Sequence, residues 1–193
     1  RRGVHRGLTS PALPGLSPRG RSYGGRVTSE NDDRPAPPVP SPVGEGLKAA
    51  FRVHPAGVAI ITAMTPDGPV GLTASSVASV AVDPAAIVFS VTRATGSAGA
   101  ILSAESFVVH LIDDEHSALA MSFAVSGADR FTDDQGWSTM PTGEPYLREA
   151  RAALRCHPTT TVRVGSSTVV IAEVDEVVLA REGRPLVYLD RRF

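Results

Sequence analysis

The chain has 193 residues, of which 42% are hydrophobic and 20% are charged, and its formal net charge is -1. This length predicts one domain with a tail, and the near-neutral charge gives no indication of a nucleic-acid or membrane-surface partner. The single cysteine, Cys156, excludes an intrachain disulfide and favours a cytoplasmic location, and no apolar run approaches the roughly 20 residues of a membrane-spanning helix.

Residues 1–43 are predicted to form a disordered N-terminal extension. Pro, Gly, Ser and Arg dominate this stretch, so few residues can bury apolar surface and offset the entropy lost on ordering. Residues 1–34 carry seven arginines against three acidic residues, a net charge of +4, so the remainder carries -5. The arginines also suggest a transit peptide, but prolines interrupt any amphipathic helix. A translation start assigned too early is a further alternative.

The body, residues 44–193, is predicted to be one folded domain. The pair Ser41-Pro42 predicts the start of a short helix, and His54-Pro55 predicts its end. Branched residues then fill 57–64, and Pro66-Asp67-Gly68 has the residue types of a tight turn. The chain returns through more apolar residues, so this segment is predicted to be a β-hairpin.

The second arm of this hairpin runs into residues 71–79, which place four hydroxyl side chains among small and apolar residues. A strand that only fills a core would carry branched apolar residues here, and a surface loop would carry more Gly, Asn, Asp or Pro. The stretch therefore suits a flat, polar-edged ligand with a phosphate, although a serine-rich strand end explains the pattern equally well. The four hydroxyls belong to Thr73, Ser75, Ser76 and Ser79.

A strand and a short helix are predicted next. Residues 86–91 are apolar on both faces, which is typical of a central strand. Ser97 is predicted to be the N-cap of a helix through residues 98–102. The free amides and positive dipole end of such a helix favour an anion by roughly 0.3–1 kcal/mol. Arg93 and Thr95 would add a charge and a hydroxyl; the alternative is an ordinary helix with a solvated arginine.

The rest of the body is predicted to be mainly β-structure. Asp113 or Asp114 is predicted to cap a helix that contains Phe123. Hairpin connections dominate, and antiparallel strands that close on themselves leave no exposed edge, so a small antiparallel barrel is favoured. The predicted segments are strands at 106–112, 153–157, 161–164, 168–179 and 185–189, a loop with two aromatic residues at 129–137, a turn at 143–146 and a tight connection at 165–167.

Side chains that could do chemistry unaided are scarce. The five histidines have no metal-ligand spacing, so no metal site is predicted, and neither a GxSxG motif nor a dinucleotide-binding fingerprint is present. Cys156 lies in an apolar strand and is predicted to be a core thiol rather than a nucleophile. If the protein is an enzyme, a cofactor is expected to carry the chemistry.

The order of motifs resembles the flavin reductase-like family, the small NAD(P)H:flavin oxidoreductases with an FMN-binding split β-barrel. The resemblance covers about residues 45–193. Each motif alone is weakly specific, whereas the ordered set is specific. The matching stretches are 51–52 with 57–62, 71–76 with 79–80, 83–84, 90–93 with Ser97, 107–111, 123–124, 129–131, 143–147, Cys156 and 185–188.

This resemblance implies a mainly β, Greek-key-like antiparallel split barrel that forms homodimers with flavin near the subunit interface. NADH or NADPH would deliver hydride to FMN or FAD, and the reduced flavin would leave for a partner monooxygenase. Ser97 and the helix start would face the phosphate. The implied flavin-binding residues are Thr73, Ala74, Ser75 and Ser76 beside the isoalloxazine or ribityl-phosphate region, Ser90, Val91, Arg93 and Ser97 around the rest, and Phe131 nearby.

Three positions depart from the family pattern. Gly165-Ser166-Ser167 stands where the family often has Gly-Asp-His, whose histidine usually helps to place the nicotinamide, and its loss would cost roughly ten- to a hundredfold in handling the hydride donor. His110 replaces an Asn and either compensates or fills space. Gly96-Ser97 replaces a hydroxyl pair. A flavin-binding carrier and a split-barrel oxidase without efficient nicotinamide oxidation therefore stay open as alternatives.

Overall fold

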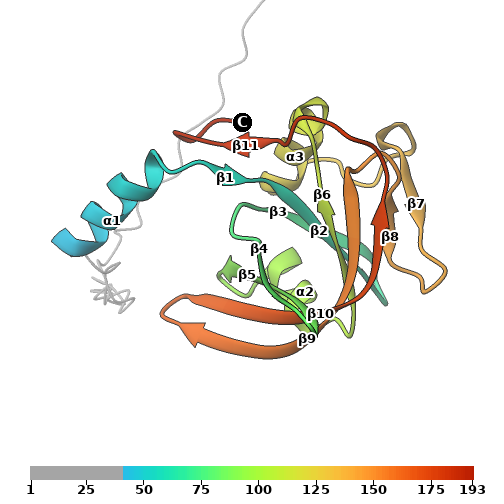
Figure 1. Ribbon diagram of the computed structural model, residues 1–193, viewed down its shortest axis with the longest axis horizontal. Helices are drawn as coiled ribbons and strands as arrows, with labels where there is room; N and C mark the ends of the chain where they lie inside the picture. The colour runs from blue at the N-terminus through green and yellow to red at the C-terminus, as the bar shows by residue number, and fades with distance from the viewer. Residues whose placement is uncertain (1–40) are drawn as a thin grey trace, which may run out of the picture. The chain divides into compact units, whose positions relative to one another are not determined.

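The computed structural model describes residues 41–193, which Figure 1 draws in colour. The predicted extension therefore falls largely on residues 1–40, outside the described residues. Helix α1 (Pro42–Arg52) begins as predicted, with Ser41 as N-cap accepting a hydrogen bond from the Gly44 amide at 3.0 Å. Pro42 and Val43, assigned to the extension by the sequence, thus belong to this helix.

Seven strands form one sheet in which every pairing is antiparallel, which confirms the predicted mainly β fold. Their order is β3-β2-β6-β9-β10-β5-β4, so β3 and β4 are the two ends of the sheet although they are consecutive in the chain. Since only residues 75–77 connect these two strands, the sheet curls until its ends approach, as in a barrel with one open seam. The strands are β2 (Ala59–Thr65), β3 (Gly68–Ala74), β4 (Ala78–Val82), β5 (Ala85–Thr92), β6 (Phe107–Leu111), β9 (Ala152–Val164) and β10 (Ser167–Leu179).

Two short sheets lie outside this barrel. Strand β1 (Ala56–Gly57) pairs with β11 (Val187–Tyr188), and β7 (Trp137–Thr139) pairs with β8 (Pro145–Leu147). The turn predicted at 143–146 is therefore wrong in its second half, which is strand β8. The predicted strands 153–157 and 161–164 are one continuous strand, β9, because a bulge beside Pro158 accommodates the proline within the ladder.

Two further helices pack on the sheet, α2 (Gly96–Ser103) and α3 (Ser117–Ala124), and 3-10 turns cover Asp114–His116 and Asp133–Gln135. Asp113 precedes the turn that leads into α3, as predicted, but its side chain caps no helix amide. It instead lies 2.6 Å from His116 Nδ1 and forms an ion pair with Arg181 Nη2 at 2.7 Å, so these two contacts replace the predicted local cap.

The strands buried on both faces are β2 and β6 rather than β5. Ala59 and Ile61 of β2 pack in the main core, whereas Ile60 packs in a second core with Phe123 of α3. Strand β5, predicted to be central, is paired on both sides but lies next to the end strand β4, and only alternate side chains, such as Phe89, are buried. The other face of β5 is therefore available to line a site.

Candidate active site

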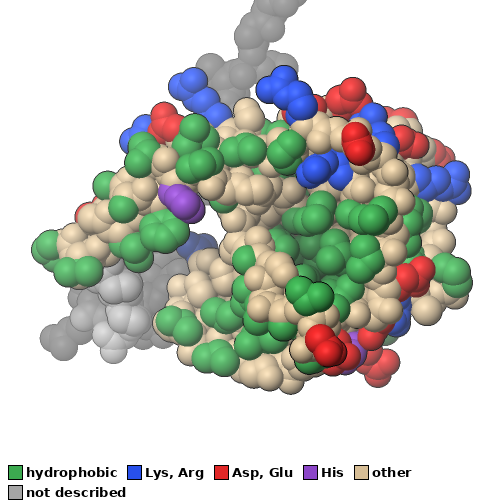
Figure 2. All heavy atoms as spheres, in the orientation of Figure 1, with side chains coloured by type: hydrophobic (Ala, Val, Ile, Leu, Met, Phe, Trp, Pro, Cys, Tyr) green, Lys and Arg blue, Asp and Glu red, His purple; other side chains and the backbone are tan. Residues whose placement is uncertain are grey.

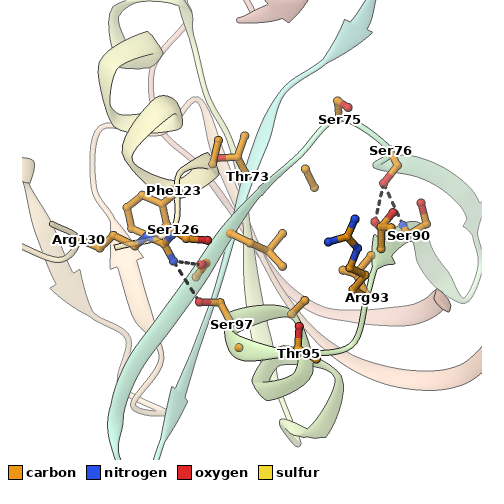
Figure 3. A pocket seen from close by; sticks show the side chains of 18 residues that line it. Thr73, Ser75, Ser76, Ser90, Arg93, Thr95, Ser97, Phe123, Ser126 and Arg130 are labelled. Atoms are coloured by element: carbon orange, nitrogen blue, oxygen red, sulfur yellow. Dashed lines mark hydrogen bonds between the residues drawn. The ribbon is translucent and has the colours of Figure 1, made fainter. Parts of the chain in front are cut away.

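A cavity of about 630 Å³ opens at the seam, between β3 and β5, with α2 and the end of α3 as its other walls (Figure 3). We call it the seam pocket. It contains two arginines, Arg93 and Arg130, and no acidic residue. Its lining is Gly71, Leu72, Thr73, Ala74, Ser75, Ser76, Ser90, Val91, Thr92, Arg93, Thr95, Gly96, Ser97, Ala98, Phe123, Ala124, Ser126 and Arg130.

Eight of the nine predicted flavin-binding residues line this one pocket, although they come from three elements and the connections between them. The exception is Phe131. Its ring packs edge-on against Phe123, with ring centroids 5.0 Å apart, and it lines a separate apolar cavity with Trp137. Phe131 therefore stands behind the pocket wall formed by Phe123. The eight are Thr73, Ala74, Ser75, Ser76, Ser90, Val91, Arg93 and Ser97.

Two of the hydroxyls are used by the fold itself. Thr73 Oγ1 donates to the Ala120 carbonyl at 2.6 Å and so ties β3 to α3. Ser76 Oγ accepts from the Ser90 amide at 2.9 Å and donates to the Ser90 carbonyl at 3.1 Å, which bridges the seam. Within residues 41–193 no hydrogen bond engages the Ser75 hydroxyl, so it remains available to a ligand.

Helix α2 begins two residues earlier than predicted, so the assignment of Ser97 as its N-cap is wrong. The N-cap is Thr95, and Gly96 has φ +56°, a left-handed conformation that favours glycine. Ser97 instead lies inside the first turn. The first amides of a helix have no partner within it, and here Gly96, Ser97 and Ala98 line the pocket. The helix start therefore offers donors to an anion, as expected.

Arg130 is a pocket residue that the sequence did not identify. Its Nη1 donates to the Gly71 carbonyl of β3 at 2.9 Å and to Ser97 Oγ of α2 at 3.1 Å. Its Nη2 and Nε donate to the carbonyls of Val125 and Ser122 at 2.7 and 3.1 Å. One guanidinium thus joins three walls of the pocket. The only signal in the sequence was its place in the 129–131 motif.

Arg93 differs from Arg130 because its side chain has no hydrogen-bond or ion-pair partner among the described residues, and Figure 3 shows it inside the pocket. Its backbone is in the left-handed region, with φ 61°, and its amide donates to the Ser166 carbonyl at 3.0 Å. Thr92 Oγ1 lies 3.3 Å from Ser167 Oγ. The connection that departs from the family pattern therefore lies at the pocket rim.

His110 and Cys156 are buried and do not line the seam pocket. The Nδ1 atom of His110 lies 3.0 Å from the Ile60 carbonyl oxygen, and its Nε2 atom accepts a hydrogen bond from the Leu147 amide at 3.1 Å. Burial lowers the pKa of His110 to about 4 and raises the pKa of Cys156 to about 12. The core-thiol interpretation of Cys156 is confirmed. His110 does more than fill space, because both nitrogens of its ring are hydrogen-bonded within the fold.

The described residues offer neither a metal site nor a membrane anchor of helical type. Between residues 41 and 193, no three side chains of His, Cys, Asp or Glu come together in a way that could hold a metal ion. The helices of this part are all too short or too polar to cross a bilayer. The seam pocket itself is lined by hydroxyls, backbone amides and guanidinium groups, a donor set that fits a phosphate-bearing organic ligand.

Comparison with known proteins agrees with this geometry. The sequence model of one protein family, the flavin reductase like domain, matches residues 51–193. An NADH:FMN oxidoreductase of Rhodococcus qingshengii is 35% identical over 150 residues, which cover 76% of this chain and 78% of that protein. The reductase component of a 4-nitrophenol 4-monooxygenase/4-nitrocatechol 2-monooxygenase of Rhodococcus opacus is 33% identical, with 76% and 80% covered.

Among solved structures, the crystal structure of a flavin reductase domain protein from Arthrobacter sp. FB24 superimposes with a TM-score of 0.71. The two chains are 33% identical, and the match covers 76% of this chain and 91% of that one. This likeness, together with the antiparallel sheet described above, confirms the split-barrel prediction. The chain belongs to the flavin reductase-like domain family.

Proposed function

We propose that this protein uses NADH or NADPH to reduce FMN or FAD in the seam pocket. The observation that carries this proposal is the pocket's composition, with two arginines, free helix amides, several hydroxyls and no carboxylate. Such a lining complements a flat ligand with a phosphate. A bound flavin accepts hydride from the nicotinamide, and the protein's own side chains provide no such acceptor. The Rhodococcus qingshengii relative, an NADH:FMN oxidoreductase, supports the assignment.

The seam pocket suggests a division of roles among its residues. Arg93 and the first amides of α2 bind the flavin phosphate, because both present unpaired donors there. Ser97 Oγ accepts from Arg130, which leaves its own proton free to donate to the ligand. Ala74 and Ser75 lie along the flavin ring, and Phe131 holds Phe123 in place from behind.

Reduced flavin is proposed to pass from this protein to a partner monooxygenase. The support is the relative in Rhodococcus opacus, which is the reductase component of such an enzyme. The buried and unpaired Cys156 is compatible with the cytoplasmic location that we also propose.

We further propose that two copies of the chain associate through helix α1. Val43, Leu47 and Phe51 lie on this helix with 82%, 59% and 65% of their surfaces exposed, and no residue of the helix is buried. An 11-residue helix is marginal by itself, so its order needs a surface to cover its apolar face. A second copy supplies such a surface, and the resemblance to homodimeric flavin reductases supports this choice.

Light scattering during size-exclusion chromatography tests the dimer. We expect the wild-type mass to be twice that of the chain, and Leu47→Glu combined with Phe51→Glu to give a monomer. Met121→Glu, a change of the same kind at a residue with 51% exposure on α3, is the control and leaves the mass unchanged. A monomeric wild-type protein contradicts the proposal.

A steady-state assay of NADH and NADPH oxidation with added FMN or FAD tests the reductase activity. We expect oxidation well above the background of free flavin, for at least one pair of nucleotide and flavin. A second candidate, a flavin carrier, is favoured by Ser166 and Ser167 at the pocket rim in place of Asp-His. Flavin that binds without any oxidation above background would replace the reductase with the carrier.

A further inference from the structure

Arg151, which directly precedes β9, has a side chain that the seam pocket does not explain. Its Nε is shielded from solvent and has no hydrogen-bond partner, and within residues 41–193 no other buried side-chain nitrogen or oxygen is left in this state. Its backbone is held, since its amide donates to the Leu111 carbonyl at 2.9 Å and its carbonyl accepts from Ala180 at 3.1 Å. An unpaired buried donor costs about 1–3 kcal/mol, so a ligand group that pairs with it is favoured.

Two cavities, of about 690 and 190 Å³, meet at Leu111 and Arg151, and we call them together the Arg151 cavity. The smaller cavity has mostly apolar walls, whereas the larger one combines apolar side chains with three charged ones. Figure 2 shows hydrophobic side chains gathered on one face of the protein. The lining residues are Leu111, Arg151, Ala152, Leu179, Ala180, Arg181, Glu182 and Gly183 in the larger cavity, and Gly57, Val58, Ala59, Val77, Ile112, Pro185 and Leu186 beside them in the smaller.

The second arginine of this cavity is already neutralised. Arg181 Nη2 lies 2.7 Å from both Asp113 Oδ2 and Glu115 Oε2, and its Nε donates to the Glu149 carbonyl at 3.3 Å. Arg151 has no comparable partner among the described residues, so its guanidinium is the uncommitted cation of a cavity whose lining also includes the carboxylate of Glu182. A guanidinium next to apolar walls is complementary to an anionic group on an apolar body.

We propose that the Arg151 cavity binds a small apolar molecule through its carboxylate or phosphate group. The planar guanidinium donates two parallel hydrogen bonds to such an oxyanion, and the apolar walls receive the remainder. The larger cavity lies within the volume range of ligand sites. It shares no lining residue with the seam pocket, but Val77 directly follows Ser75 and Ser76 of that pocket. A bound molecule therefore touches the connection that forms one wall of the flavin site.

Calorimetric titration of the flavin-free full chain with benzoate, phenyl phosphate and benzyl alcohol tests this site. We expect benzoate or phenyl phosphate to bind at least tenfold more tightly than benzyl alcohol, and the tighter of the two identifies the head group. Arg151→Met abolishes this preference and keeps the flavin-dependent oxidation of NADH, which shows that the variant is folded. Arg93→Met, which removes the proposed phosphate contact of the seam pocket, leaves benzoate binding unchanged and removes only the phenyl phosphate that is bound at that pocket.

Several results overturn the proposal. These are equal binding of the charged and uncharged probes, undiminished binding by Arg151→Met, and inorganic phosphate that binds as tightly as phenyl phosphate. A change from dimer to monomer in Arg151→Met, without probe binding by the wild type, assigns the cavity to a subunit interface instead. If Arg151→Met does not fold, Arg151→Lys replaces it. The affinity for the charged probe is then expected to fall at least threefold, because an ammonium lacks the planar fork of a guanidinium.

Discussion

His110 links the barrel to the β7–β8 sheet through both nitrogens of its ring. Its Nδ1 lies 3.0 Å from the Ile60 carbonyl, an acceptor, so the proton is on Nδ1, and Nε2 accepts from the Leu147 amide. This arrangement requires the neutral ring. Because burial lowers the pKa of His110 to about 4, against an ordinary value of 6.5, the unfolded chain binds this proton more readily than the folded one.

The free energy of unfolding is therefore expected to decrease as the pH is lowered from about 6.5 to 4. The contribution of neutral His110 to stability is fully present above pH 6.5. It is lost below that pH because the unfolded chain binds a proton that the folded chain does not, and the loss is about 2 kcal/mol between pH 7 and pH 5. Urea unfolding at the two pH values measures this loss. His110→Asn has no such group, and a variant that loses as much stability as the wild type contradicts the assignment.

The hydroxyl-rich stretch shows how far sequence reasoning reaches at single residues. Its residues 71–76 line the seam pocket, and their role in binding a ligand stays a prediction. It could not reveal that Thr73 and Ser76 bond to the backbone, because their partners, Ala120 and Ser90, are 47 and 14 positions away. Which hydroxyls remain for a ligand is decided by the curled sheet.

At the level of elements, Arg130 holds β3, α2 and α3 in a fixed relation around the seam pocket. Its guanidinium donates to Ser97 Oγ and to three carbonyls, and its carbon Cζ lies 5.5 Å from the centre of the Phe123 ring. These donors are used within the protein. Arg130 is therefore a positioning residue, whereas Arg93 retains its donors for the ligand.

Arg130→Met is expected to weaken FMN and riboflavin binding by similar factors, about tenfold each, because the pocket walls lose their common anchor. Arg130→Lys restores part of the affinity, since an ammonium can keep one of the contacts. Fluorescence titration of the wild type and both variants with each flavin measures the six dissociation constants. A variant that loses FMN affinity and keeps riboflavin affinity identifies Arg130 as a phosphate ligand instead.

Elements that depend on neighbouring residues were predicted well, and those that depend on distant ones were not. The start of α1 at Ser41-Pro42 and the turn at 66–68 follow from local residue preferences, and both are present. The short strands β7 and β8 exist only because each pairs with the other. The start of α2 differs from the predicted one because Gly96 adopts a left-handed conformation, which residue preferences did not predict.

In the whole molecule, the seam pocket follows from the curvature of one sheet. The two end strands, β3 and β4, are consecutive in the chain, and the pocket opens between β3 and β5, beside the connection that joins the sheet ends. Alternating apolar patterns predicted the strands, and the ordered motifs predicted the family. Neither gave the order of the strands across the sheet, which depends on contacts far apart in the sequence.

The central claim is that the seam pocket holds a flavin by its phosphate, through Arg93 and the start of α2. Titration of wild type and Arg93→Met with FMN and riboflavin tests it most directly. A hydrogen bond to a charged group contributes roughly 1.5–3 kcal/mol, so Arg93→Met is expected to weaken FMN binding about ten- to a hundredfold and to leave riboflavin binding within about twofold. Unchanged FMN affinity, or an equal loss for both flavins, would contradict the account.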